Sequence, residues 1–597
     1  MTRHTSVRAG LLAGFLAGGV LLTACAQVPE SGRVVEAQQL GAAVAAPEYS
    51  NPKPPQKGDS QSDIVTGFLV AMTATPLRIT TAQKFLTKQA SAQWEPQGVL
   101  TYNDHTLAQP VQHHHVVVVR LQGADEVGSR GQWQGAPSPD AHRLVFPMVR
   151  ENNEWRISQA PNALVIPKTF YDQQYQEAEI YFFDPSGRIL VPEPVHVPQG
   201  SLASALVRAL VGGPSRSLTG VVHSFLPPAL SAEPVPVSND GVADVTLTLN
   251  GQAPGPMSRT TTELVLDQLS WTLRQDASIT GFRLSIAGHQ VTDPTGTTES
   301  TIFRFDTNET DSHDPAVSKA SSQYYALRSG RLVSGQLTHP TSVDGPFGEQ
   351  RVGIGPFAIS LNGEEAAGVT SDGLLVGQVS QPGPAVRVVS GSDLLRPAWD
   401  FSHRLWEIQD TSRGAVVSYV HRNRDHVVRV PGISGHDVTR FLVSRDGSRL
   451  VAVLHGPSTD RIMVSRIRYD ADDRPERGTP ARRIPWESSG AVRIRDIGWS
   501  SPTTLEVLDQ LSARQSETRI LNVDGSTEAD EAPTTTIPGP AVGLVTSPVG
   551  GPQTPYAVLA RTRSARRSLY DLAQVDTTPP SVASISIPAL RHITYAG

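Results

Sequence analysis

The chain contains a single cysteine, Cys25, among its 597 residues. No disulfide can therefore form within one molecule, and no zinc site can be built from cysteine ligands. Each folded part must be held together by its own hydrophobic core. A hydrophobic share of 38%, with 6% aromatic residues, is at the level of globular proteins and suffices for such cores.

The residues before Cys25 have the parts of a secretory signal peptide. Residues 1–8 carry Arg3, His4 and Arg8 and no acid, and residues 9–24 carry no charge. A basic start, a short apolar run and an exit of small residues predict export and removal of residues 1–24. The apolar run is shorter than the ~20 residues that a confident membrane span needs.

The exit itself resembles a bacterial lipobox. In that motif an aliphatic, a small polar and a small residue precede an obligatory cysteine, and here these are Leu22, Thr23, Ala24 and Cys25. The resemblance implies that the Cys25 sulfur takes a diacylglycerol thioether and that the amine freed by cleavage is acylated. Because more than one acyl chain makes a stable anchor, we expect a lipid-anchored protein on the extracytoplasmic face of the cell membrane. The alternative is an incidental cysteine in a plain signal peptide or a short membrane anchor.

Length and charge limit the number of domains and the classes of partner that the rest of the chain can have. One core rarely grows past ~250–300 residues, so several domains are expected. The formal net charge is −6, and removal of residues 1–24 takes away two arginines and no acid, which leaves −8. A mildly acidic exported chain is a poor candidate for binding nucleic acid. Past Cys25 no uncharged apolar run approaches eighteen residues, so no second membrane span is expected.

Residues 25–60 are expected to be the lipidated cysteine and a tether, because prolines alternate there with Gly, Ser and Gln. Residues 61–168 are expected to form an α+β domain. A helix is predicted after Ser62, its expected N-cap, and a second helix over 81–94. Strands are predicted over 111–121, 143–149 and 154–157. Helices followed by antiparallel strands indicate an α+β unit, and a curved sheet wrapped on helices, like NTF2-like domains, is its expected form.

Residues 169–307 show a second α+β pattern. Strands are predicted over 178–183 and 189–192, joined by an Asp-Pro-Ser-Gly turn. Ser201 is the expected cap of a helix that Gly212-Gly213-Pro214 ends, and a second helix is predicted over 261–274, followed by a strand over 281–286. This order, with Leu-Pro-Pro at 226–228 and Asp-Gly at 240–241, resembles the GerMN domain. The matching residues are turn formers, helix breakers and core, so we assign none of them to a site.

Residues 308–320 are polar and are expected to be a linker. From 321 to 597 the chain consists of short predicted strands, with two loose repeats. Ser360-Leu361-Asn362-Gly363 and Ser444-Arg445-Asp446-Gly447 each precede a small apolar strand, and a second pair, around Trp399 and Trp499, is taken to lie out of phase with the first. Such units predict a β-propeller of about six or seven blades. The alternative is a pair of β-sandwiches.

The order of lipobox, proline tether, α+β domain, GerMN domain and degenerate propeller resembles the actinobacterial lipoprotein LpqB family over nearly the whole chain. The start of the expected mature chain, Cys25-Ala26-Gln27-Val28-Pro29, resembles that family too. The resemblance implies a non-catalytic regulatory lipoprotein that acts on the extracellular domain of the sensor histidine kinase of an envelope two-component system.

Catalytic and metal signatures are missing from the sequence, and no cofactor is expected. There is no Gly-x-Ser-x-Gly elbow, no His-Glu-x-x-His and no Gly-Lys pair of a phosphate-binding loop. The run His113-His114-His115 suggests a metal site, but neighbours on a strand point to opposite faces. We therefore favour a solvated strand there, and a solvated loop for the acids of 470–473.

Two classes of function stay open. The first is the non-catalytic interaction protein with the kinase sensor domain as its partner. The second is an envelope glycan-binding protein or hydrolase with a site on the propeller. Acids and histidines converging on the propeller axis would favour the second class, whereas arginine and apolar side chains there would favour the first.

Overall fold

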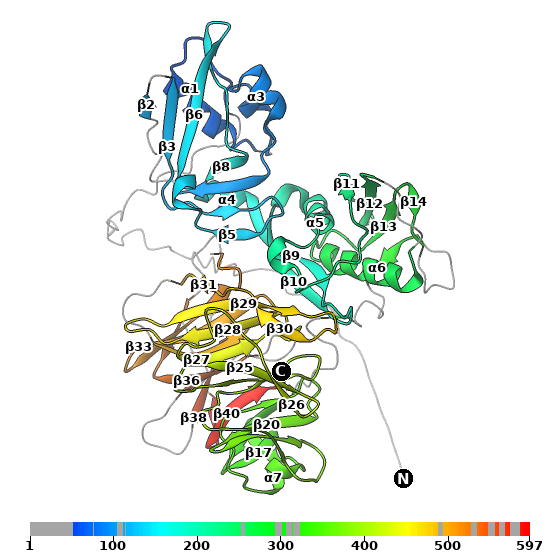
Figure 1. Ribbon diagram of the computed structural model, residues 1–597, viewed down its shortest axis with the longest axis vertical. Coiled ribbons are helices and arrows are strands. Elements are labelled where there is room, and N and C mark those ends of the chain that lie inside the picture. The colour runs from blue at the N-terminus through cyan, green and yellow to red at the C-terminus, as the bar shows by residue number, and fades with distance from the viewer. Residues whose placement is uncertain are drawn as a thin grey trace, which may run out of the picture. The chain divides into compact units, whose positions relative to one another are not determined.

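The computed structural model of the chain describes residues 52–75, 77–103, 111–113, 115–251, 257–292, 301–305, 313–314, 323–486, 493–526, 534–546, 556–559, 567–572 and 585–597. Along the chain, two regions of mixed helices and strands are followed by a long all-β region (Figure 1). This order confirms the predicted multidomain class.

The first region contains four α-helices and two four-stranded sheets among its described residues. The sheets have the strand orders β5-β4-β1-β8 and β2-β3-β6-β7. The elements are α1 (Gln61–Ala71), α2 (Thr80–Gln83), α3 (Lys88–Gln93), β1 (Gly98–Tyr102), β2 (Val111–His113), β3 (Val116–Arg120), β4 (Glu126–Val127), β5 (Trp133–Gly135), β6 (Arg143–Glu151), β7 (Glu154–Ile157), β8 (Ala163–Pro167) and α4 (Lys168–Gln174). Helix α1 buries Phe68 against Trp94 and Phe146, with ring centroids 5.2 and 6.1 Å away. The α+β assignment is thus confirmed, and the NTF2-like form stays a prediction.

Three local predictions in this region are wrong. Helix α1 is capped by Ser60, not Ser62: the Ser60 hydroxyl accepts from the Asp63 N–H at 3.2 Å, and the Asp63 carboxylate accepts from the Ser60 N–H at 3.1 Å. This reciprocal capping box satisfies two helix-end donors at once. It also places Ser60, which we assigned to the tether, at the start of the folded region.

The helix predicted over 81–94 is two short helices with an extended segment between them. The Phe85 carbonyl accepts from the Ile157 N–H at 3.0 Å, and the Thr87 N–H donates to the Ile157 carbonyl at 2.9 Å. These bonds to the end of β7 replace helical ones, and Thr87 then caps α3 by accepting from the Ala90 N–H at 3.1 Å.

The strand predicted over 111–121 is a hairpin, with β2 antiparallel to β3 and His113 opposite Val116. His113 therefore ends one strand, and His115 lies in the turn before the next, so the two do not share a strand. His115 packs against Trp155, with ring centroids 5.5 Å apart.

The second region begins with a long hairpin of β9 (Tyr175–Phe183) and β10 (Leu190–Pro198). The remaining strands form the order β11-β12-β13-β14, with β15 also paired to β13. The elements are α5 (Leu202–Val211), β11 (Leu230–Ala232), β12 (Val242–Leu249), α6 (Arg259–Leu273), β13 (Gly281–Ile286), β14 (His289–Gln290) and β15 (Phe303–Arg304). Strands β12 and β13 are parallel, so α6 is the crossover between them. The predicted strands and helices of this region are confirmed, but β10 continues six residues past its predicted end, and Ser201 precedes α5 without making a side-chain capping bond.

Helix α6 also holds the hairpin. The fully buried Gln268 donates from Nε2 to the Tyr181 carbonyl of β9 at 3.0 Å, and its Oε1 accepts from the Phe225 N–H at 2.8 Å. Of the predicted linker, the described His313 contacts the same region: its carbonyl accepts from the Leu190 N–H at 2.9 Å, and its Nδ1 lies 2.6 Å from an Asp267 oxygen.

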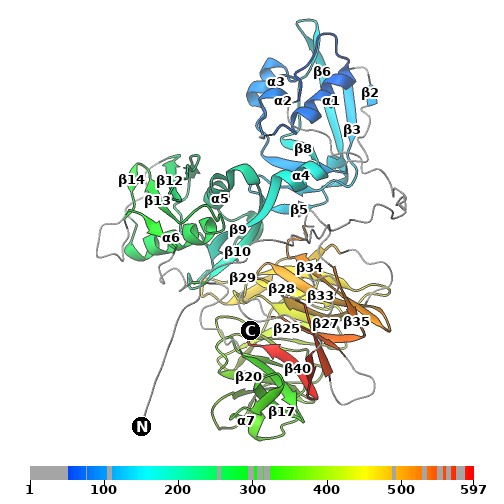
Figure 2. The same cartoon turned by 180° about the vertical axis from the view of Figure 1, so that it is seen from behind.

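The third region consists of six sheets among its described residues, five with four strands and one with five (Figures 1 and 2). Their strands are β16 (Tyr324–Arg328), β17 (Arg331–Gln336), β18 (His339–Ser342), β19 (Phe357–Ile359), β20 (Glu365–Thr370), β21 (Gly373–Gln378), β22 (Val386–Ser390), β23 (Ala398–Trp399), β24 (Leu405–Gln409), β25 (Val416–His421), β26 (Arg424–Val427), β27 (Val438–Val443), β28 (Arg449–Leu454), β29 (Arg461–Tyr469), β30 (Pro475–Gly478), β32 (Ile494–Trp499), β33 (Thr504–Ser512), β34 (Gln515–Asn522), β35 (Thr534–Pro538), β36 (Ala541–Val545), β37 (Tyr556–Leu559), β38 (Arg567–Asp571), β39 (Ile585–Ile587) and β40 (Leu590–Tyr595). Two short elements join them, α7 (Pro346–Glu349) and β31 (Arg482–Ile484), which pairs with β29.

These sheets are the blades of a closed propeller. The first strands of successive blades contact one another in the order β19, β23, β27, β32, β36, β40 and back to β19. The last strand of the chain, β40, completes the blade of β16–β18 by pairing with β16 (Figure 2). Six hydrophobic clusters of described residues each join two neighbouring blades. The propeller prediction is confirmed, with six blades.

The two sequence repeats lie in phase, contrary to our prediction. The N–H groups of Ser360, Asp400, Ser444 and Ser500 all donate to a carbonyl four or five residues later, at 2.8–3.1 Å. Each residue therefore opens the turn between the first two strands of its blade. The pairs look distinct because each recurs in alternate blades.

Candidate functional site

The residues predicted to carry the lipid anchor, Leu22, Thr23, Ala24 and Cys25, lie outside the described residues. Within the described ranges, no helix is long and apolar enough to span a membrane.

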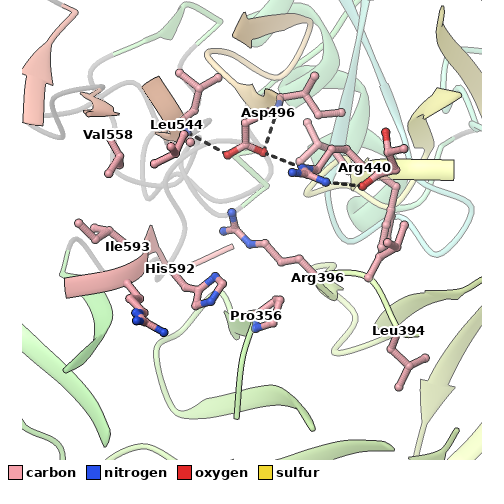
Figure 3. A pocket seen from close by; sticks show the side chains of 17 residues that line it. Pro356, Leu394, Arg396, Arg440, Asp496, Leu544, Val558, His592 and Ile593 are labelled. Carbon is pink, nitrogen blue, oxygen red and sulfur yellow. Dashed lines mark hydrogen bonds and ion pairs between the residues drawn. The ribbon is translucent and has the colours of Figure 1, made fainter. Parts of the chain in front are cut away.

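A cavity of about 470 Å³ lies on the propeller axis. All six blades contribute to it, mainly through the first halves of their innermost strands (Figure 3). Its walls are formed by Pro356, Leu394, Leu395, Arg396, Thr439, Arg440, Phe441, Leu442, Asp496, Ile497, Val542, Gly543, Leu544, Val558, Arg591, His592 and Ile593. Its size is in the range of small-molecule sites, which occupy ~300–1,000 Å³.

Six of these residues hold equivalent places in the six blades. The innermost strands end at Ile359, Trp399, Val443, Trp499, Val545 and Tyr595. Counting back three residues from each end gives, in order around the axis, Pro356, Arg396, Arg440, Asp496, Val542 and His592, and we call this set the axial ring. In three consecutive blades the strand pairing shifts register next to this position, between Val438 and Arg440, Ile494 and Asp496, and Ala541 and Gly543. Such bulges re-aim side chains.

The charged members of the axial ring are neighbours. Asp496 accepts from the Leu544 N–H at 2.9 Å and from the Ile497 N–H at 3.1 Å, which fixes its carboxylate (Figure 3). Arg440 lies 3.6 Å from Asp496 and donates to the Thr439 carbonyl at 2.7 Å. Arg396 hydrogen-bonds to Thr594 of β40. Among the described residues, no carboxylate lies within 4 Å of the Arg396 guanidinium.

Burial dominates the electrostatics of the two deeper groups. It raises the pKa of Asp496 above its usual range, an effect that Arg396 and the hydrogen bonds partly oppose. Burial also lowers the pKa of Arg396, as does the nearby charge of Arg440, whereas Asp496 opposes this shift. Arg591 and His592 are exposed and add further basic side chains to the lining.

The first-to-second-strand turns lie beyond the opposite ends of the innermost strands, and on this side three blades contact the β9–β10 hairpin. Arg188 donates to the Ser402 hydroxyl at 2.9 Å. Glu193 of β10 lies 3.3 Å from the fully buried Arg449 and also pairs with Arg466. His196 lies 3.3 Å from the carboxylate of Asp524, which follows the third strand, β34, of the next blade. The hairpin therefore contacts the side of the propeller where the innermost strands end, whereas the axial cavity is lined mainly by the first halves of those innermost strands.

The acidic residues 470–473, weighed in the sequence as a cation site, form a turn between β29 and β30. In this turn the Asp470 carboxylate accepts from the N–H groups of Asp472 and Arg474, both at 2.9 Å. Within the part of the chain that the structure describes, no group of three or more His, Cys, Asp or Glu could hold a metal ion.

The axial ring escaped the sequence analysis because its members share no residue type. The signal was a spacing: Arg396 and Asp496 each precede by three residues the tryptophans already recognised as repeat markers, Trp399 and Trp499. Had the repeats been aligned in one phase, this offset would have selected both residues.

Three family profiles match the chain. The profile described as lipoprotein LpqB, N-terminal domain, matches residues 54–172, that described as sporulation and spore germination matches 179–292, and that described as the lipoprotein LpqB beta-propeller domain matches 330–551. The two LpqB profiles together cover more than half of the chain. The middle match confirms the resemblance to GerMN domains.

Relatives named Lipoprotein LpqB are similar over most of their length. The protein of Thermobifida fusca is 26% identical over 570 residues, which are 86% of this chain and 89% of that protein. The protein of Cutibacterium acnes is 25% identical over 557 residues, which are 88% of this chain and 90% of that protein. Among solved structures, TolB from Acinetobacter baumannii is 13% identical, with 58% of this chain and 88% of that chain covered, at a TM-score of 0.33, too low to carry an argument.

Proposed function

The chain belongs to the LpqB lipoprotein family, and from that premise we propose that it is a non-catalytic regulatory module. In this proposal a lipid on Cys25 holds the exported chain on the extracytoplasmic face of the membrane. Its folded domains bind the extracellular sensor domain of an envelope two-component histidine kinase and shift the signalling equilibrium of that kinase.

The lining of the axial cavity is the observation that carries the non-catalytic part. Hydrolysis of a glycoside ordinarily needs two carboxyl groups on either side of the bond. Among the described residues that line the cavity, Asp496 is the one carboxylate, and arginine and apolar side chains make up most of the rest. This composition favours an interaction module over the alternative, an envelope glycan-binding protein or hydrolase.

The lipid anchor is what allows the proposed interaction to be occupied even if its affinity is low. A lipid-held protein and a membrane-spanning kinase share a two-dimensional surface, so tethering raises their effective concentration and even a weak interface is occupied. For the kinase output to change, the module must bind one state of the kinase better than the other.

The test uses the full-length protein and the Cys25→Ser variant. Only the unsubstituted chain should incorporate a labelled fatty acid and sediment with membranes, because the variant lacks the sulfur that takes the lipid. In vesicles that hold the kinase, the lipidated protein should change the rate of kinase autophosphorylation, and an equal amount of Cys25→Ser protein should change it far less.

Two results would contradict the proposal. Equal labelling and sedimentation of the Cys25→Ser protein would exclude Cys25 as the anchor. Unchanged kinase output with the lipidated protein, together with a hydrolase activity lost in Asp496→Asn, would replace the regulatory reading by the enzymatic one.

A further inference from the structure

The axial cavity holds more positive than negative charge. Its described lining contains Arg396, Arg440 and Arg591 against the single carboxylate of Asp496. Arg440 is the arginine within 4 Å of that carboxylate, so Asp496 can neutralise one guanidinium and not all three. Clefts lined by one sign of charge and low-dielectric walls concentrate the opposite ion.

Arg396 and Arg440 occupy neighbouring places in the axial ring. Burial is the main cause of the lowered pKa of Arg396; Asp496 opposes this shift, and the positive charge of Arg440 adds to it. Arg396 is partly buried and keeps one hydrogen bond, to Thr594, among the described residues. An anion between the two groups would relieve their repulsion and accept the donors that Arg396 turns to the cavity (Figure 3).

The geometry of arginine narrows the chemistry of that anion. The planar fork of a guanidinium matches the paired oxygens of a carboxylate or phosphate, which it can bind through two parallel hydrogen bonds. The rest of the wall is largely apolar, with Leu394, Phe441, Leu544 and Ile593 among its residues. A ligand that fits both parts carries one anionic head and a small apolar body.

We propose that the axial cavity binds a small organic anion, with its carboxylate or phosphate group between Arg396 and Arg440 and its apolar body against the blade strands. This ligand site goes beyond the proposed regulatory function and does not depend on it. It requires no metal, no catalysis and no protein partner.

The test is calorimetric titration of the purified full-length chain with benzoate and phenyl phosphate. Benzyl alcohol, which has a similar apolar body and no charge, is the matched neutral probe. We expect one site per chain and at least about tenfold tighter binding of one anion than of the alcohol. The better of the two anions identifies the head group as carboxylate or phosphate.

Substitutions then locate the site. Arg396→Gln should weaken anion binding by about tenfold or more, and Arg440→Gln should weaken it several-fold. Asp496→Asn should strengthen it, because a competing negative charge is removed. Arg387→Gln is the control, since Arg387 is an exposed arginine of β22 that pairs with Asp372 outside the cavity, and it should leave binding unchanged.

Several results of the same binding measurements would contradict the proposal. Equal binding of anion and alcohol, or no binding of either anion at millimolar concentration, would overturn the proposal. So would equal affinities in Arg396→Gln and Arg387→Gln. If Arg396→Gln fails to melt cooperatively, Arg440→Gln decides, because the Arg440 side chain is 46% exposed and we expect its replacement to leave the fold intact.

Discussion

At the scale of single residues, buried acids of the propeller set its response to pH. Glu407 of β24 is 3% exposed, its Oε1 accepts from the Ser418 hydroxyl, and its Oε2 has no partner among the described residues. Burial raises the pKa of Glu407 to about 7, although the bond from Ser418 opposes the shift. The native state therefore holds this proton more tightly than the unfolded chain does.

The sign of the effect follows from that difference. Between the ordinary pKa of 4.5 and about 7, rising pH removes the proton more easily from the unfolded chain, so the free energy of unfolding falls. Glu407→Gln removes this cost. We expect the variant to be more stable by about 1–3 kcal/mol at pH 8 and unchanged at pH 4. The measurement is the urea unfolding midpoint at both pH values.

The control is Glu476→Gln, which replaces a glutamate of β30 whose side chain is 57% exposed. It should shift neither midpoint. A Glu407→Gln midpoint that moves equally at both pH values would show that packing, and not the proton, is responsible.

At the scale of elements, the ring of blades depends on its last strand. Strand β40 pairs with β16, and its Leu590 and Ile593 are buried in the cluster between two blades. Deletion of residues 589–597 removes both side chains, and the loss of each large core side chain costs about 2–5 kcal/mol. That loss is comparable with the whole stability of a domain, ~5–15 kcal/mol.

We therefore expect the truncated chain to lose the cooperative thermal transition of the propeller and to become sensitive to protease. Circular dichroism melting measures the first effect and limited proteolysis the second. Arg591→Gln, an exposed substitution on the same strand, should melt like the unsubstituted chain. A truncated chain that keeps its transition would mean that β40 does not close the ring.

At this scale, the elements that could be predicted from the sequence are those marked by a pattern of neighbouring residues. Helices α1, α5 and α6 were predicted because their apolar residues recur at helical spacing. The break at Phe85–Thr87 was missed because its cause is non-local: the bonds go to Ile157, about 70 positions further along the chain. The hairpin of β2 and β3 was missed because the sequence from His113 to Val119 consists of histidines and valines, with no glycine, proline, asparagine or aspartate to mark a turn.

The candidate site was beyond local pattern for a related reason. A propeller axis is lined by one short stretch from each blade, and in this chain these stretches are 40–56 residues apart in the sequence. The spacing between Arg396, Arg440 and Asp496 does not predict that they lie together until the blades are aligned with one another. The cysteine anchor, by contrast, is a contiguous motif and needs no fold to be recognised.

At the scale of the whole molecule, the β9–β10 hairpin joins the second region to the propeller through buried charge. Arg449 of the propeller is fully buried, and burial lowers its pKa to about 10. Its described carboxylate partners are Glu193 of β10 at 3.3 Å and Asp446 at 3.5 Å. Removal of one partner of a buried ion pair costs about 3–5 kcal/mol, mostly because the other charge is left uncompensated.

We expect residues 60–310 and 320–597 to fold separately even though these contacts join them. Each fragment has its own hydrophobic clusters, so each should melt cooperatively. The 320–597 fragment should melt below the propeller of the intact chain, since Arg449 has lost Glu193. When the fragments are mixed, they should associate and recover part of that difference.

The Glu193→Gln variant of the 60–310 fragment tests whether the ion pair holds the two together. It keeps the shape of the side chain and removes its charge, so association measured by calorimetry should weaken by at least about tenfold. Glu263→Gln, on α6, replaces a glutamate that pairs with Arg259 within its own helix and is the matched control. Equal association of the two variants would show that the charge on β10 does not secure the hairpin. Failure of both fragments to melt, while the intact chain does, would place the domain boundary elsewhere.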